Sequence, residues 1–390
     1  MNSEIKNCTT KKDILEMISR NGVTNFIPLL EILLNEAMKM ERNEALKAEA
    51  YERTEQRQGY ANGFKSRTIQ TRVGKLKVNI PQVRGTSFYP QALEKGTRTE
   101  IALNLAVAEM YLNGVSTRKV EAITKELCGF DISSTQVSRC SKLLDEKLET
   151  FRSRPLSDKY AYVYLDATYE KVRNGGSVVS MATLVALGIN EEGQREILGI
   201  SSKLSEAKVH WKSFLESLQE RGLSGTQLII SDDHAGLKAA RKEVFPGIKW
   251  QRCQFHMAQN AQQYAPKKTM QEELGEALRK ILHSTDYETA KEQVKKVIQQ
   301  YSEKAPAFVN WLEENIEEGL TCFSFPEKHR KQIRTSNMIE RLNREIKRRT
   351  QVVTVFCSVA SCERLVTAVL ESQHNDWAAR RKYMNMNLLK

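Results

Sequence analysis

The feature that most restricts the fold of this 390-residue chain is the order of its strand-like and helical segments between residues 160 and 265. The first three segments are strand-like and are separated by short turns rich in glycine and acids; they span 161–167, 177–189 and 195–202. Helices at 207–221, 234–244 and from 254 then alternate with strands at 226–231 and 248–252. Hairpins followed by βα units predict a mixed five-stranded sheet with helices on its faces.

This order is that of a ribonuclease-H-like fold, in which one acid lies on the first strand and another at the end of the fourth. Asp166 follows the apolar run 161–165, and Asp232 directly follows the run 228–231, so the two aspartates occupy those places. The predicted fold class is therefore α/β (α+β), with a ribonuclease-H-like catalytic core.

A third acid, Glu340, lies in a basic helical segment, residues 337–349. On a helical wheel, the apolar residues of this segment gather opposite Glu340. The residues that share its polar, cationic face are Asn337, Asn343, Arg344 and Lys347. The alternative is an ordinary solvated face on which Glu340 and Arg344 form an i,i+4 pair.

Three carboxylates on separate segments predict a site for Mg²⁺ or Mn²⁺, with two ions expected. In such a site one ion activates an attacking water or a DNA 3′-hydroxyl, and the other stabilises the leaving oxygen. Asp232 is preferred over Asp233 because it directly follows the apolar strand. The competing acids are Asp233, Glu170 and Asp376.

Three further residues are expected beside these acids. His234 contacts a phosphate or the Asp232 backbone, or merely caps the next helix. Cys253 and His256 form a C-x2-H pair at the end of the fifth strand, which resembles half of a zinc site. Since no second pair follows at finger spacing, a structural role near the acids is favoured.

The net charge of +12, from 60 Lys and Arg against 48 Asp and Glu, favours a polyanionic partner, and nucleic acid is favoured over a membrane surface. A merely basic enzyme is the alternative.

Two helices before the sheet resemble a helix-turn-helix. One begins at Ser116 with a buried stripe of Val120, Ile123 and Leu127, and the next opens with a capping box of Ser133 and Gln136. An alternating segment from residue 69 to 80 predicts a β-hairpin with one basic face, preceded by a turn-rich joint at 58–65.

These features predict where double-stranded DNA binds. The candidate contacts on the helix-turn-helix are Arg118, Lys119, Ser134, Gln136, Arg139 and Lys142. Those on the hairpin are Arg72, Lys75 and Lys77, and those on the basic helix are Lys347, Arg348 and Arg349.

The expected organisation has six parts. They are a helical arm, which dimerises or packs on its own domain (1–57), the basic hairpin region (58–98), the helix-turn-helix-like domain (99–152), the first part of the core (153–265), a helical insertion (266–331), and the second part of the core with the Glu340 helix and a C-terminal helix (332–390). The seven scattered cysteines indicate reduced thiols in an intracellular protein. The sequence predicts neither a signal peptide nor a membrane span, and no membrane partner.

Four motifs together resemble the Mutator-type transposases of bacterial insertion sequences, a family of DDE transposases. They lie at 164–173, 231–237, 253–256 and 335–343, and a block from Gly59 to Gln91 is also similar. The resemblance covers roughly residues 45–380. Two departures are visible: Cys357 stands where proline is expected, and Thr168 and Glu170 differ from the first motif.

By this resemblance, Asp166, Asp232 and Glu340 are the catalytic triad and the ligands of the metal. The family implies Mg²⁺-dependent cleavage at terminal inverted repeats and strand transfer into target DNA, in the bacterial cytoplasm at the nucleoid. A homodimer is expected because transposition brings two ends together. The rival hypotheses are a structure-specific nuclease on the same fold, a non-catalytic helix-turn-helix regulator, and an inactive transposase.

Overall fold

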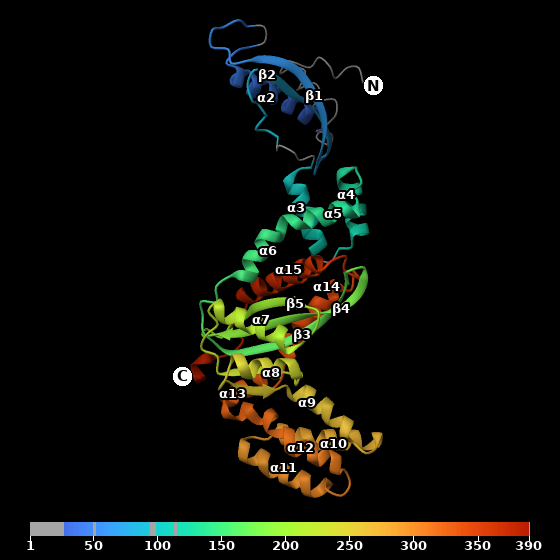
Figure 1. The fold of residues 1–390 in the computed structure, drawn as a ribbon, viewed down its shortest axis with the longest axis vertical. Coiled ribbons are helices and arrows are strands. Elements are labelled where there is room, and N and C mark those ends of the chain that lie inside the picture. Colours follow the sequence, from blue (N-terminus) through green and yellow to red (C-terminus); the bar gives the residue numbers. More distant parts are fainter. Residues whose placement is uncertain (1–26, 50–51, 94–98, 113–114, 390) are drawn as a thin grey trace. The chain divides into compact units, whose positions relative to one another are not determined.

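The computed structural model describes residues 27–49, 52–93, 99–112 and 115–389, and the chain divides into two compact units, 1–144 and 145–390 (Figure 1). Part of the expected N-terminal arm, residues 1–26, lies outside the described residues. The described part of that arm is the helix α2 (Ile27–Leu46).

The first unit contains a two-stranded antiparallel hairpin, β1 (Tyr60–Thr71) and β2 (Gly74–Arg84). The alternation predicted for the hairpin is confirmed in β2, where Leu76, Val78 and Ile80 are buried and the residues between them are exposed. In the first half Ile69 is partly buried and Val73 is 48% exposed. The turn-rich joint expected at 58–65 is wrong, since β1 already begins at Tyr60. The Asn62-Gly63 pair that suggested a turn lies instead at a register shift within the strand pairing, between Ala61 and Phe64.

Helix α2 packs on this hairpin, with Met38 of α2 buried against Val78 and Ile80. Glu31 and Asn35 accept hydrogen bonds from backbone nitrogens of β2 at 2.6 and 2.7 Å. These bonds satisfy the outer edge of β2, which would otherwise present unpaired donors. The arm was expected either to dimerise or to pack on its own domain, and α2 packs on its own domain.

Three helices complete the first unit: α3 (Ile101–Leu112), α4 (Thr117–Cys128) and α5 (Ser134–Ser141), followed by the 3-10 turn η2 (Lys142–Leu144). The start of α4 at Ser116 is confirmed by the Ser116 side chain, which accepts a hydrogen bond from the Lys119 backbone. The predicted buried stripe is confirmed at Val120 and wrong at Leu127, which is 74% exposed; Thr124 and Cys128 are buried instead, and Ile123 is partly buried.

The capping box expected at the start of α5 forms only in part. Ser133 accepts a hydrogen bond from the Gln136 backbone, as expected. The Gln136 side chain, however, donates to Gln70 and Thr99 at 3.1 and 3.4 Å instead of returning to the cap. Gln136 is therefore used in contacts between α5 and the hairpin region.

The second unit is built on a five-stranded mixed sheet with the order β5-β4-β3-β6-β7. Strands β3, β4 and β5 are antiparallel neighbours, and β6 and β7 run parallel to β3. This arrangement confirms the predicted mixed five-stranded sheet. The strands are β3 (Tyr160–Asn174), β4 (Ser177–Asn190), β5 (Arg195–Lys203), β6 (Leu228–Ser231) and β7 (Lys249–Arg252).

Strand β3 is much longer than the predicted 161–167 because it pairs with β4 as far as Asn174 and Ser177. Asp166 therefore lies within a strand and does not end one. The neighbouring strand β6 ends at Ser231, so the far half of β3 loses this partner. Phe356 takes its place there, exchanging backbone hydrogen bonds with Lys171 and Arg173 at 2.9 Å.

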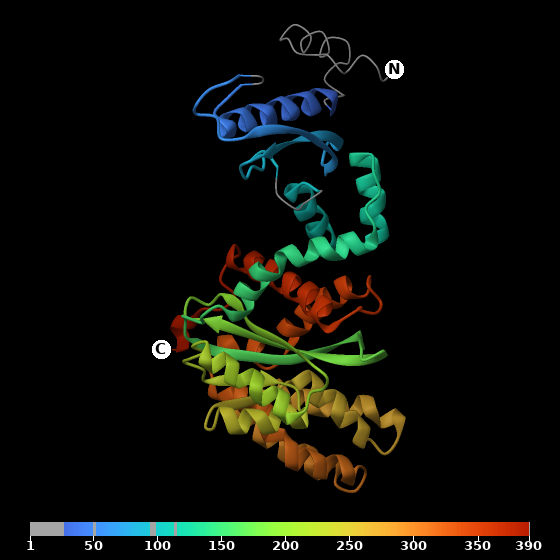
Figure 2. The ribbon, with the colours of Figure 1, turned by 45° about the horizontal axis from the view of Figure 1, so that its top comes forward.

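Helices cover both faces of the sheet (Figure 2). One face packs on Trp211, Phe214 and Leu215 of α7 and on Leu237 and Ala240 of α8 in a single apolar core. The opposite face carries α14 and α15. These helices are α7 (Lys208–Glu220), α8 (Ala235–Val244), α14 (Asn337–Thr350) and α15 (Val359–Ala378). Helix α6 (Asp145–Ser153) packs on α15.

A block of helices separates β7 from α14, as expected for the predicted insertion. It has an apolar core of its own, centred on residues such as Leu278, Phe308 and Leu312. Its elements are α9 (Gln254–Ala261), η3 (Gln262–Tyr264), η4 (Lys268–Met270), α10 (Gln271–Leu282), α11 (Tyr287–Tyr301), α12 (Pro306–Leu320), η5 (Thr321–Ser324) and α13 (Glu327–Ile333). The chain's last described element is η6 (Met386–Leu389).

Within the described ranges, the structure contains no helix with both the length and the apolar character needed to cross a bilayer.

Candidate active site

The register of two parallel strands brings Asp166 and Asp232 to the same level of the sheet. Tyr164 of β3 pairs with Ile230 of β6, and each aspartate lies two residues beyond its member of this pair. Because side chains alternate along a strand, a residue two positions further on points to the same face. The tyrosines at 162 and 164 contact His329 and the Gln332 carbonyl of the α13 segment, so Asp166 shares the α13–α14 face.

Helix α14 brings Glu340 to this face because its apolar stripe is anchored in the protein. The predicted stripe is confirmed, since its members are all buried: Met338, Ile339, Leu342 and Ile346. The polar side of α14 then meets β3. Asn343 donates a hydrogen bond through Nδ2 to Asp166 Oδ2 at 2.8 Å.

The electrostatics of Asp166 reflect its burial and the charges of the other two acids. Burial and the charges of Asp232 and Glu340 raise the pKa of Asp166 to about 7, although the Ala167 backbone N–H and the His256 side chain act in the opposite direction. Neighbouring carboxylates repel one another when ionised and therefore favour protonation. A bound cation offsets this repulsion. Carboxylate oxygens of this kind are the donors that Mg²⁺ and Mn²⁺ prefer.

Each of the three acids is held by a nearby donor. The Ala167 backbone nitrogen donates to Asp166 Oδ1 at 2.8 Å, and the His234 backbone nitrogen donates to Asp232 Oδ1 at 3.3 Å. Ser336, which precedes α14, donates through its hydroxyl to Glu340 Oε1 at 2.9 Å. The carboxylates are thus oriented by the chain itself.

His234 occupies the N-cap position of α8, but its side chain makes no capping hydrogen bond. Its imidazole Nδ1 lies 3.7 Å from Glu206 Oε2. The contact observed between His234 and Asp232 differs from the one expected with the Asp232 backbone: the His234 backbone nitrogen donates to the Asp232 side chain.

The C-x2-H pair lies beside Glu340, as expected for residues near the acids. Ligand atoms of Cys253, His256 and Glu340 all fall within 4.8 Å of one another. Although burial raises the pKa of the Cys253 thiol, the interactions with His256 and Ser336 outweigh it and lower that pKa. The neighbouring thiol and the carboxylates of Glu340 and Asp166 raise the pKa of His256 to about 9, against the effect of burial.

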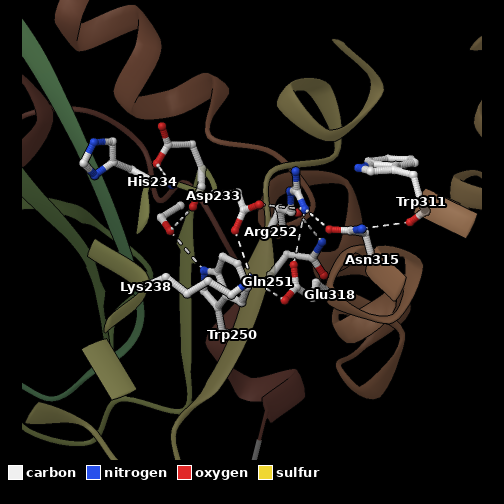
Figure 3. Close-up of polar contacts among 11 residues, drawn as sticks. Asp233, His234, Lys238, Trp250, Gln251, Arg252, Trp311, Asn315 and Glu318 are labelled. Atoms are coloured by element: carbon white, nitrogen blue, oxygen red, sulfur yellow. Dashed lines mark hydrogen bonds and ion pairs between the residues drawn. The ribbon is translucent and has the colours of Figure 1, made fainter. Parts of the chain in front are cut away.

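The loop that carries Asp232 is fixed by a closed ring of four charges (Figure 3). Asp233 contacts Lys238 at 3.0 Å and the buried Arg252 at 2.9 Å. Glu318 of α12 contacts the same two cations, at 2.6 and 3.3 Å. The insertion therefore supplies one carboxylate of a ring that holds the residue next to Asp232.

Arg252, the last residue of β7, and Cys253, which follows it, tie the acid-bearing segments together. Arg252 reaches Asp233 within the ring and also donates to Asn315 at 2.8 Å. The Cys253 backbone nitrogen donates to the Ser231 carbonyl at 2.7 Å, directly before Asp232. The Ser336 backbone nitrogen and hydroxyl lie 3.3 and 3.0 Å from Cys253 Sγ, which connects β7 to the start of α14.

The three competing acids have other partners. Asp233 belongs to the ring, and Glu170 is buried and paired with Lys347 at 3.0 Å. Asp376 accepts an exposed hydrogen bond from Gln373 on α15. None of these contacts involves Asp166, Asp232 or Glu340.

The predicted DNA contacts differ in how accessible they are. On α14, Arg344 is exposed, Lys347 is paired with Glu170 and also donates to the Tyr169 carbonyl, and Arg348 is paired with Glu345. Arg349 is partly buried and Asn337 is exposed. The Lys347 ammonium group is therefore already occupied by contacts within the protein.

In the first unit most of the predicted contacts are exposed. Arg72 is paired with Glu100 at 3.2 Å, and Lys75 lies over the Phe130 ring. The Ser134 side chain lies outside the described part of the structure, and Gln136 is half-buried. The remaining exposed candidates are Lys77, Arg118, Lys119, Arg139 and Lys142.

Several residues of the site were not singled out in the sequence. Ser336 precedes Asn337 in the last motif, and its position before a helix was the only signal for a capping or orienting role. Arg252 ends a strand that looks polar, and Glu318 lies far along the chain, so nothing local identified the charge ring. Asn315 was missed for the same reason.

Similarity to known proteins extends over nearly the whole chain. Residues 3–380 match the family described as "Transposase, Mutator family". The chain is 47% identical to the transposase for insertion sequence element IS406 of Burkholderia multivorans, over 94% of this chain and 95% of that protein. It is 44% identical to the ISRM5 transposase of Rhizobium meliloti, over 97% and 94%, and 36% identical to the IS256 transposase in transposon Tn4001 of Staphylococcus aureus, over 97% and 98%. The chain belongs to the Mutator family of transposases.

Proposed function

We propose that this transposase uses DDE chemistry, with Asp166, Asp232 and Glu340 holding Mg²⁺ or Mn²⁺, two ions being expected. It would cleave DNA at the terminal inverted repeats of its element and join the ends to target DNA. The observation that carries the proposal is the placement of Asp166 and Asp232 at one level of the sheet, together with the hydrogen bond by which Asn343, on the helix of Glu340, joins Asp166. The names of the relatives, all insertion-sequence transposases, support the same substrate class.

Bound divalent cations would stabilise the attacking and leaving oxygens of an in-line displacement at phosphorus. The contribution of the chain is to position its ligands. Asn343 and the Ala167 N–H orient the two oxygens of Asp166, the His234 N–H orients Asp232, and Ser336 orients Glu340. Carboxylates that are already oriented lose less conformational freedom when they bind a cation and a phosphate.

We further propose that the mixed sheet and its helices are a ribonuclease-H-like core. The supporting observations are the strand order and the positions of Asp166 on β3 and Asp232 after β6. The pair α4 and α5 is proposed as a helix-turn-helix, in which Arg118, Arg139 and Lys142 are exposed and available to phosphates. A homodimer that pairs two transposon ends in the cytoplasm, at the nucleoid, completes the proposal.

The test is a strand-transfer assay with donor ends, a target plasmid and Mg²⁺. Replacement of Asp166, Asp232 or Glu340 by Ala is expected to abolish cleavage and joining while DNA binding at moderate salt is retained. Near wild-type strand transfer by any one variant would remove that residue from the site. Cleavage without joining would identify a nuclease, and specific DNA binding without any metal-dependent product would identify a regulator.

A further inference from the structure

Three chemically different ligands meet where β7 ends and α14 begins. Cys253 lies at the N-cap of α9, His256 lies in its first turn, and Glu340 lies in the first turn of α14. Their ligand atoms lie within 4.8 Å of one another, with Cys253 fully buried and the other two partly buried. The sequence supplied only the Cys and His of this cluster, and the fold adds the carboxylate.

The chain holds these ligands from several directions. Backbone hydrogen bonds join Cys253 to the Ser231 carbonyl at 2.7 Å and Gln254 to the Arg334 carbonyl at 3.0 Å, which docks the start of α9 on both acid-bearing segments. Ser336 contacts Cys253 Sγ and Glu340 Oε1. The distances between the ligands are therefore set by packing and do not depend on a mobile loop.

The surroundings of the sulfur and of the imidazole suit a metal ligand. The Ser336 backbone N–H donates to Cys253 Sγ at 3.3 Å, and such a donor stabilises a thiolate. The single hydroxyl proton of Ser336 serves either Cys253 Sγ or Glu340 Oε1, which lie 3.0 and 2.9 Å from its oxygen. His256 Nδ1 is a buried atom without a hydrogen-bond partner among the described residues. A buried nitrogen of this kind lacks compensation for its lost water unless a ligand occupies the site.

We propose that Cys253, His256 and Glu340 form a site for a soft divalent cation of the Zn²⁺ class, distinct from the oxygen-only Mg²⁺ site. Thiolate and imidazole donors select Zn²⁺ or Co²⁺ over Mg²⁺, and three protein ligands leave a fourth position open. Glu340 belongs to both sites. A corollary, which rests on the proposed function, is that Zn²⁺ competes with Mg²⁺ for Glu340 and reversibly inhibits strand transfer.

The experiment titrates the metal-free, full-length protein with Co²⁺ in the absence of DNA. One equivalent of Co²⁺ is expected to produce the visible bands of a tetrahedral ion and the ultraviolet charge-transfer band of a thiolate ligand. Zn²⁺ is expected to displace it. Cys253→Ser should lose the charge-transfer band, and His256→Gln should weaken Co²⁺ binding by at least about 100-fold, the upper end of the loss seen when an outer-shell partner is removed.

Two matched variants act as controls. Cys357→Ser removes an exposed thiol of the same unit and should leave both bands unchanged. Asp166→Asn disables the proposed Mg²⁺ site but should keep the Co²⁺ bands, so that failure of the two proposals is distinguishable. The partly buried His256 provides a second variant if Cys253→Ser fails to fold. Absence of saturable Co²⁺ binding, or binding with a charge-transfer band that persists in Cys253→Ser, would overturn the soft-cation site.

Discussion

Asn343 on α14 donates its side-chain N–H to Asp166 on β3 at 2.8 Å, across 177 positions of the sequence. The other atom of this amide, Asn343 Oδ1, is buried without a hydrogen-bond partner in the described structure. The amide thus fixes one oxygen of Asp166 and keeps an acceptor beside the candidate metal site. This contact joins the helix of the third acid directly to the strand of the first.

Replacement of Asn343 by Ala is expected to reduce strand transfer with little change in DNA affinity. A hydrogen bond to a charged group contributes about 1.5–3 kcal/mol, which corresponds to roughly a 10- to 100-fold fall in rate when it acts on the reacting geometry. Single-turnover rates at saturating Mg²⁺ measure the effect. Glu345→Gln, which breaks only an exposed pair with Arg348 on the same helix, is the control and should retain the wild-type rate. Equal rates for the two variants would contradict an orienting role for Asn343.

Asp166→Asn is expected to stabilise the metal-free protein at pH 8. Because the folded-state pKa of Asp166 is raised from 3.8 to about 7, the folded protein retains a proton between these values that the unfolded chain has released. Stability therefore falls as the pH rises through this window, by no more than about 4 kcal/mol. Asn343 is able to rotate its amide and accept a hydrogen bond from the amide that this substitution introduces.

Thermal denaturation in the presence of a chelator, from pH 4.5 to pH 8, measures this difference. The gain in melting temperature should be largest at pH 8 and should shrink toward the acid end. A destabilised variant at pH 8 would show that Asp166 does not carry a strained charge in the folded protein.

The same raised pKa predicts how activity depends on pH and Mg²⁺ together. A cation must displace the proton of Asp166, so strand transfer should rise with pH around 7 at low Mg²⁺. Higher Mg²⁺ should move the midpoint of this rise to lower pH. Rates measured across pH at two Mg²⁺ concentrations test the prediction, and a midpoint that is independent of Mg²⁺ would contradict it.

Much of the sheet was predictable because its signals are local. The glycine-rich turns and the alternation of helical and strand patterns were sufficient for the five strands and for Asp232 after β6. The apolar stripe of α14 follows from residues three and four apart, and the structure buries it as predicted. These features need no knowledge of distant partners.

The features that the sequence did not predict depend on contacts between segments that are distant along the chain. The length of β3 is set by its pairing with β4, so Asp166 lies within a strand although its apolar run ends at Leu165. In α4, Thr124 is buried and Leu127 is exposed. The face of α4 that packs on the rest of the unit is therefore not its most apolar face, and that choice depends on tertiary contacts. The ring around Arg252 joins residues 66 positions apart, and a buried arginine at a strand end has no local signature.

The charge ring predicts that the insertion influences metal binding at Asp232. Glu318→Gln removes one of two carboxylates that hold Lys238 and the buried Arg252, which keeps Asp233 and Asn315 as partners. The free energy of unfolding should fall by about 1–3 kcal/mol. If the ring positions the Asp232 loop, the Mg²⁺ concentration for half-maximal strand transfer should also rise, by roughly tenfold.

Glu314→Gln, at an exposed position on the same helix, is the matched control and should change neither quantity. Mg²⁺ titrations of strand transfer, with Mn²⁺ as a tighter-binding substitute, separate the two effects, because a folding defect alone lowers the yield equally at every metal concentration. Mn²⁺ should restore most of the activity of Glu318→Gln, since a cation that binds more tightly tolerates a displaced ligand. An unchanged Mg²⁺ requirement in Glu318→Gln would confine the ring to stability and separate the insertion from the chemistry at Asp232.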